Sequence, residues 1–183
     1  MKSVDLIGLH VETTTGAPLV LLREHDLPHR VLPIFIGGAE AASIALALSG
    51  ERPPRPLAHD VMAALVTSLD AHIDAVEVTD VVDGAFLAQL ALRGPSGGRR
   101  LDTRPSDAIA LAVRLGTPLF VSEAVLDQAG SLVEDLVEVE ALDDESLEHE
   151  VAEFRSFLDT IDPTDFGPLV GPDNGEPTPP DES

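Results

Sequence analysis

The sequence predicts an α+β fold, with a mixed, largely antiparallel sheet and helices packed against it. Helical and strand-like segments are mixed without a regular βαβ alternation, and several strand-like segments are joined by short turns. Composition agrees, because 44% of the 183 residues are hydrophobic, enough for a buried core, while only 3% are aromatic. Leu, Val, Ile and Ala must therefore build that core.

The first part of the chain predicts a meander followed by a helix. Three β-rich stretches, 4–14, 18–25 and 30–36, are separated by turn signals at 15–18 and 26–28. Gly37 and Gly38 then lead into a predicted helix over 39–48, which Gly50 ends. The short length and apolar face of this helix predict that it is buried.

A proline-rich segment over 50–56 predicts an ordered loop or a hinge, because its prolines remove hydrogen-bond donors and force extended backbone before them. Asp60 then suits the N-cap of a helix that runs to about His72. The apolar stripe of this predicted helix consists of Met62, Leu65, Val66 and Leu69.

The middle of the chain predicts a hairpin and a second buried helix. Residues 75–93 alternate between apolar and polar side chains, and Asp83-Gly84 is a strong two-residue turn signal. A short strand over 99–102 precedes a helix that opens at Pro105 and ends at Gly116. A strand over 119–121 and a helix over 123–128 follow.

The C-terminal third differs in composition. Residues 131–145 are acidic and predict a strand or a loop near 132–139, and an amphipathic helix follows from Ser146. The last 17 residues are rich in Pro and Gly and predict disorder. We therefore divide the chain into a domain over 1–135, an acidic segment with a helix over 136–166, and a disordered tail over 167–183. The apolar side of the amphipathic helix consists of Leu147, Val151, Phe154, Leu158 and Ile161.

Charge and composition exclude several classes of site. The formal net charge is -22, but residues 1–122 hold 14 acids and 10 bases, whereas residues 123–183 hold 19 acids and one base, Arg155. The charge of residues 1–122 is therefore close to balanced, and it does not exclude a phosphate ligand. The chain has no Cys, which excludes disulfides and thiolate metal sites. No signal peptide or membrane span is visible, so we expect a cytoplasmic protein with no membrane partner.

Two segments resemble each other: Arg55-Pro56 followed by His59-Asp60, and Arg104-Pro105 followed by Ser106-Asp107. Each would present a guanidinium, a carboxylate and free backbone N–H groups at a helix start, a combination that suits an anion bridged by a divalent metal. We expect Arg55 and Arg104 to hold phosphate oxygens, and His59 to move a proton.

Asp60 and Asp107 then hold Mg²⁺ or Mn²⁺, and Glu40, after the double glycine, is a further candidate ligand. We count His59, Asp60 and Asp107 as candidate catalytic residues, and Arg52 joins Arg55 and Arg104 as a candidate nucleic-acid contact. The alternative is structural: an Asp in the first turn of a helix is commonly a cap, and an Arg beside it commonly an internal ion-pair partner.

Four segments together resemble the bifunctional nuclease family: LPIFIGGAEAASIALALSG, RPLAHD, DGAFLAQLAL and RPSDAIALAVRLGTPLFVSEAVL. The resemblance covers most of residues 1–130. It implies an α+β fold, both DNase and RNase activity, and a dimer in at least some members. The family's conserved residues match Glu40, Arg55, Pro56, His59, Asp60, Arg104, Pro105, Ser106 and Asp107. Many members have Thr where this chain has Ala58, so a role for that hydroxyl does not carry over.

Two functions from different classes follow. The first is a nuclease that hydrolyses phosphodiester bonds of DNA and RNA, assisted by a divalent metal and acting as a homodimer. The second is a non-catalytic regulatory or scaffold domain that binds a small anion or a partner protein. A third interpretation, purely structural helix starts with apolar helices in an oligomer interface, also stays open.

Overall fold

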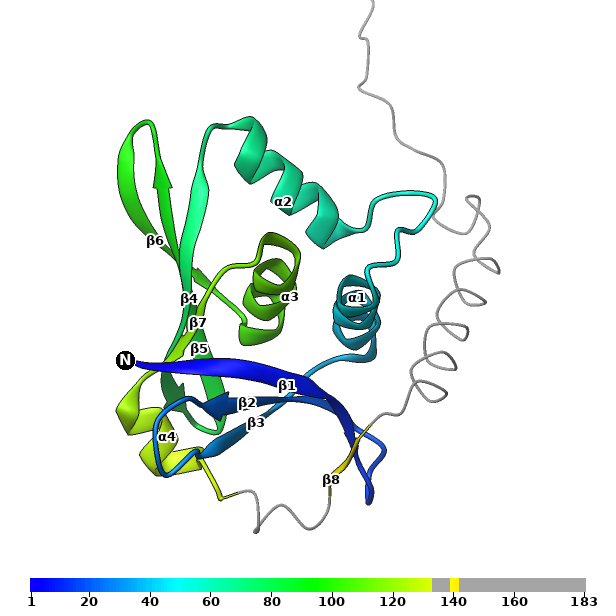
Figure 1. Cartoon of the computed structure of the whole chain (residues 1–183), viewed down its shortest axis with the longest axis vertical. Helices are drawn as coiled ribbons and strands as arrows, with labels where there is room; N and C mark the ends of the chain where they lie inside the picture. The colour runs from blue at the N-terminus through cyan, green and yellow to red at the C-terminus, as the bar shows by residue number, and fades with distance from the viewer. Residues whose placement is uncertain (133–138, 142–183) are drawn as a thin grey trace, which may run out of the picture.

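The computed structural model describes residues 1–132 and 139–141, and this part of the chain forms one mixed sheet with four helices (Figure 1). The strand order is β3-β2-β1-β7-β4-β5-β6, and β8 pairs with β1. Between described strands every pairing is antiparallel except that of β4 with β7. The predicted α+β class and the largely antiparallel sheet are therefore confirmed.

The predicted meander forms the first three strands. Strands β1 (Lys2–Glu12), β2 (Pro18–Glu24) and β3 (Val31–Phe35) pair in sequence order. β7 (Leu119–Val121) pairs with the first residues of β1, and β8 (Val139–Ala141) pairs with its last residues. The short strands β7 and β8 therefore both pair with the same edge of the long strand β1.

The predicted hairpin forms the other half of the sheet. β4 (His72–Val82) and β5 (Ala85–Gly94) meet at Asp83-Gly84, where both residues have positive φ, at 51° and 81°. Two positive φ angles define the tight turn that matches the twist of paired strands, which is why Asp-Gly is favoured there. β6 (Gly97–Thr103) then pairs with β5 as an edge strand.

Helix α3 (Pro105–Leu115) is the centre of the helical layer. It packs on β4 and β5, and it contacts both α1 (Gly38–Ser49) and α2 (Ala58–Ser68), as Figure 1 shows. Five consecutive residues from Ala108 to Ala112 are buried, so α3 is enclosed on all sides. The short helix α4 (Glu123–Ala129) contacts β3 and β4, apart from the other three helices. The starts of α1, α2 and α3 thus share one neighbourhood.

Two sequence predictions about α2 are wrong. The helix ends at Ser68, and His72 instead begins β4, where it pairs with Arg93. Asp70 adopts a positive φ of 52°, so the chain turns there and strand pairing replaces the helical pattern. Of the predicted apolar stripe, Val66 packs against the core, whereas the other three side chains are exposed: Met62, Leu65 and Leu69.

Several predictions fall outside the described residues. These are the amphipathic helix from Ser146, the disordered tail over 167–183, and most of the acidic stretch over 131–145, of which 131–132 and β8 are described. The domain boundaries at 135 and 166 also stay predictions. Among the described helices, none is long and apolar enough to span a membrane.

Candidate phosphate-binding site at three helix starts

Arg104 occupies the N-cap of α3 in an extended conformation, with Pro105 as the first helical residue. Asp107 lies three residues further on, close enough for its carboxylate to turn back toward the cap. Nε of Arg104 donates to Oδ2 of Asp107 at 2.7 Å, and Nη2 donates to Oδ1 at 3.0 Å. The local sequence therefore builds a two-point guanidinium–carboxylate pair.

Glu40 reaches the same arginine from α1. Its Oε1 accepts from Nη2 of Arg104 at 2.7 Å, so residues 64 positions apart in the chain meet. Gly37, the N-cap of α1, allows this approach, because a Cβ atom at that position would collide with the Glu40 carboxylate. This steric argument applies to Gly37 alone, because a Cβ atom at Gly38 would meet no other atom within 4 Å.

His59 enters from the first turn of α2 and is largely buried, with 10% of its side chain exposed. Its Nε2 lies 3.1 Å from Oδ1 of Asp107, and its Nδ1 lies 2.9 Å from Oγ of Ser43 in α1. Both ring nitrogens are therefore engaged. We call Glu40, His59, Arg104 and Asp107 the Arg104 cluster.

The electrostatics of the Arg104 cluster follow from these contacts. Hydrogen bonding from Arg104 lowers the pKa of Asp107 against the opposing effect of burial, and His59 lowers it further. The same pairing with Asp107 and Glu40 raises the pKa of Arg104. With His59 neutral, the cluster has one positive and two negative side chains, hence a net charge of -1. The guanidinium is nonetheless accessible, since 66% of the Arg104 side chain is exposed.

Asp60 belongs to a neighbouring network. Its Oδ1 accepts from Nε of Arg114 at 2.5 Å, and its Oδ2 accepts from the Leu57 backbone N–H at 2.8 Å. Burial tends to raise the pKa of Asp60, but Arg114 and the Leu57 N–H together lower it. Leu57, not Asp60, is the N-cap of α2. Asp60 thus closes the start of α2 from its third helical position and pairs with an arginine of α3.

Arg114 also joins this network to α1. Its Nη2 donates to the backbone oxygen of Ser43 at 3.1 Å and to Oγ of Ser43 at 3.0 Å, and its Nη1 donates to the carbonyl of Ala110. Only 9% of the Arg114 side chain is exposed. We call Ser43, Asp60 and Arg114 the Arg114 cluster.

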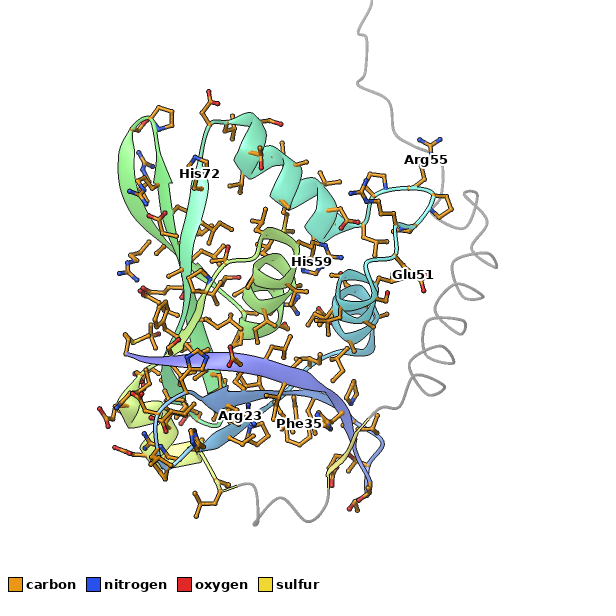
Figure 2. The ribbon with its side chains drawn as sticks, in the orientation of Figure 1. Arg23, Phe35, Glu51, Arg55, His59 and His72 are labelled. Carbon is orange, nitrogen blue, oxygen red and sulfur yellow. The ribbon has the colours of Figure 1, made fainter. Side chains whose placement is uncertain are left out.

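The two remaining candidate arginines do not reach the Arg104 cluster. Arg52 and Arg55 are exposed on the loop between α1 and α2. In Figure 2, Arg55 projects from the outer part of this loop, away from His59. Within the described residues, no hydrogen bond or ion pair joins either arginine to Glu40, His59 or Asp107. Their role as nucleic-acid contacts stays a prediction.

The predicted metal ligands do not share one position. Glu40 and Asp107 both contact Arg104, whereas Asp60 contacts Arg114. Across the described part of the chain, no group of three or more His, Asp or Glu side chains is arranged to hold a metal ion. The donor types suit Mg²⁺ or Mn²⁺, but this arrangement does not fit a divalent ion without movement of Arg104.

Ser43 and Arg114 were not among the residues predicted from the sequence. A usable signal exists for each. Ser43 is the single polar residue between Glu40 and Ser49 in an otherwise apolar helix. Arg114 follows Asp107 by seven residues, or two helical turns, which places it on the same side of α3.

The fold and the site together define an α+β domain in which an exposed arginine and two carboxylates converge from helix starts distant in the chain. Comparison with known proteins gives the family. The bifunctional nuclease domain matches residues 20–134, and the chain belongs to this family.

Individual relatives extend the comparison over different lengths. An uncharacterized protein of Mycobacterium tuberculosis is 42% identical over 166 residues, which cover 91% of this chain and 98% of the relative. Bifunctional nuclease 1 of Arabidopsis thaliana is 29% identical over 119 residues, 63% of this chain and 37% of that protein. Bifunctional nuclease 1 of Oryza sativa subsp. japonica is 27% identical over 109 residues, 58% of this chain and 33% of that protein.

Proposed function

We propose that the chain hydrolyses phosphodiester bonds of DNA and RNA at the Arg104 cluster. The observation that carries the proposal is the convergence of Arg104, Asp107 and His59 at one position, where the guanidinium of Arg104 is exposed to solvent. Family membership supports it, and so do the names of the plant relatives. Single-stranded or flexible nucleic acid is the expected substrate, because a scissile phosphate must approach three helix starts closely.

The chemistry assigns a role to each member of the cluster. Nη1 of Arg104 makes no hydrogen bond within the described residues, so its two N–H groups are available to a phosphate oxygen. A water oxygen then attacks phosphorus, the bond to the leaving sugar oxygen breaks, and the leaving oxygen takes a proton from bulk water. Asp107 is the group placed to take the water proton, with His59 behind it as hydrogen-bond partner.

A divalent metal remains part of the proposal as an added ion. A cluster of net charge -1 repels a phosphodiester, so an additional cation near Glu40 and Asp107 would favour binding. No step is assigned to the metal, because the described side chains do not fit one as they stand.

The test is cleavage of labelled single-stranded DNA, single-stranded RNA and duplex by the purified full chain, with Mg²⁺, Mn²⁺ or EDTA. Asp107→Asn and Arg104→Gln should abolish cleavage while the protein stays folded. Arg93→Gln is the matched control, since Arg93 is also exposed and paired with an aspartate, Asp74, outside the site. Cleavage that survives both site variants would show a contaminating nuclease and refute the proposal.

The pairing of Arg104 with two carboxylates favours one other function, that of a non-catalytic domain that binds a small anion or a partner protein. Thermal unfolding with nucleotides, sugar phosphates and divalent ions discriminates between the two. Stabilisation by a metabolite, with no cleavage of nucleic acid, would support the binding domain.

We also propose a homodimer. The exposed side chains Met62 and Leu65 on α2, and Leu69 directly after its end, form an apolar face that a second copy would cover. Light scattering coupled to size exclusion measures the mass directly. A monomer at micromolar concentration would contradict this proposal, and it would leave the nuclease assignment untouched.

A further inference from the structure

Arg114 contacts the three helices that supply the Arg104 cluster. It belongs to α3, which carries Asp107; it pairs with Asp60 in α2, one residue after His59; and it donates to Ser43 in α1, three residues after Glu40. A planar guanidinium held at several fixed points restricts these helix starts relative to one another. The Arg114 side chain is nearly buried, so it acts through its neighbours and does not touch a substrate.

The contact with Ser43 has a direction. The guanidinium can only donate, so Oγ of Ser43 accepts from Arg114 at 3.0 Å. The second partner of this hydroxyl is Nδ1 of His59, at 2.9 Å. The hydroxyl can donate one hydrogen bond while it accepts from Arg114, so its own proton is available to Nδ1 if Nδ1 is unprotonated.

The opposite edge of the ring determines which nitrogen is protonated. Asp107 is a carboxylate that also accepts from Arg104, and an ionised carboxylate can only accept hydrogen bonds. Nε2 of His59, 3.1 Å from Oδ1 of Asp107, must therefore be the donor. The neutral ring therefore has its proton on Nε2, its Nδ1 is the acceptor, and the Ser43 hydroxyl donates to Nδ1.

We infer that Arg114 is the positioning residue of the site: through Ser43 it holds the His59 ring with its proton on Nε2, directed at Asp107. The hydrogen bonds then run in one direction, from Arg114 to Ser43, from Ser43 to His59 and from His59 to Asp107. Asp107 is fixed from two sides, by His59 and by Arg104. The inference rests on the proposed function only for its kinetic consequence, because the tautomer is a property of the resting protein.

The test is nitrogen-15 NMR of the histidine side chains in the full chain, at about pH 8, where an ordinary histidine is neutral. Correlations between ring nitrogens and ring protons identify which nitrogen is protonated, and His59→Gln assigns the signal among the six histidines. We expect one tautomer for His59, with the proton on Nε2. A proton on Nδ1, or a mixture of the two forms in the wild type, would overturn the inference.

Two variants test the hydrogen bonds that run from Arg114 through Ser43 to His59. Ser43→Ala removes the hydroxyl that donates to Nδ1, and Arg114→Lys keeps a positive charge but cannot bind Asp60 and Ser43 as a fork. Each should move the Nδ1 resonance of His59 toward that of an acceptor nitrogen without a hydrogen bond, while Asp107 keeps the proton on Nε2. Ser49→Ala is the matched control, since Ser49 lies in the same helix and its hydroxyl bonds to the Leu46 carbonyl. An unchanged signal in Ser43→Ala would overturn the inference even if Arg114→Lys does not fold.

The kinetic consequence is separate. If the chain cleaves nucleic acid, Ser43→Ala should lower kcat about tenfold or more, with KM nearly unchanged, as is typical when a histidine loses its orienting partner. A normal kcat together with a changed Nδ1 resonance would show that the orientation of His59 does not serve the reaction. The absence of any cleavage in the wild type would refute the proposed function and leave the tautomer assignment standing.

Discussion

Replacement of Asp60 separates a structural role from a catalytic one. In Asp60→Asn, the amide oxygen can still accept from the Leu57 N–H, but the charge opposite Arg114 is lost. Removal of one partner of a buried ion pair costs about 3–5 kcal/mol. Here 31% of the Asp60 side chain is exposed and water can replace part of the interaction, so we expect a loss of about 2 kcal/mol in the free energy of unfolding.

Asp60→Ala loses the helix-start hydrogen bond as well. That bond contributes about 1 kcal/mol, which brings the expected loss to about 3 kcal/mol. Urea unfolding followed by far-UV circular dichroism measures both values, and it suits a chain that has no Trp or Tyr for fluorescence. Asp74→Asn is the control, since it breaks an exposed pair with Arg93 and should leave the unfolding midpoint unchanged.

The decisive result is the comparison of stability with activity. If Asp60 acts through Arg114, both Asp60 variants lower stability, and cleavage by the folded fraction decreases less than in Asp107→Asn. If Asp60→Asn unfolds at the wild-type urea concentration but cleaves nothing, the structural reasoning is refuted. Asp60 would then be the catalytic or metal-binding residue that the sequence predicted.

Three further predictions use the same site. Because the folded-state pKa values of Asp60 and Asp107 are lowered, their contribution to stability is present above the ordinary value of 3.8 and is lost as the pH falls through the lowered values. Lowering the pH from about 5 to about 2 should therefore reduce the free energy of unfolding more in the wild type than in Asp60→Asn. An equal dependence of that free energy on pH in the two proteins would contradict the pKa directions. Glu40→Gln should raise affinity for an oligonucleotide in EDTA, measured by fluorescence anisotropy, because the net charge of the Arg104 cluster changes from -1 to 0. Weaker binding of the oligonucleotide by Glu40→Gln in EDTA would argue against Glu40 as a counter-ion of Arg104. A loss of affinity seen only with Mg²⁺ would identify Glu40 as a metal ligand. Arg55→Gln should reduce the dependence of log affinity on log salt by about one unit if its loop contacts a phosphate, and an unchanged slope would remove Arg55 from the binding surface.

The sequence predicted the sheet well because its signals are local. Asp83-Gly84 requires nothing beyond its neighbours to form a tight turn, and Pro105 and Gly116 mark both ends of α3 by backbone geometry alone. The end of α2 was misjudged because the helical pattern continues past Ser68, while the strand pairing of His72 with Arg93 depends on a partner distant in the chain.

The site was predicted in part for the same reason. Arg104 and Asp107 form a pair within one turn of helix, so their association is visible in four consecutive residues. The similarity of the two Arg-Pro segments suggested that both would supply the same site, which the structure does not show. Arg55 lies on an exposed loop, and Asp60 takes its arginine from position 114, 54 residues further on. Such long-range choices of partner leave no local pattern in the sequence.

Strand β7 has a consequence for how the protein is made. Its three residues lie between β1 and β4, so the N-terminal meander and the hairpin half of the sheet are joined through a segment that comes late in the chain. A nascent chain that has not yet reached residue 119 has two open strand edges, which are templates for pairing with another copy. Translation beyond Val121 joins the two halves through β7, and β8 later pairs with the last residues of β1. Protection of these edges during synthesis is a need that the topology imposes on the cell.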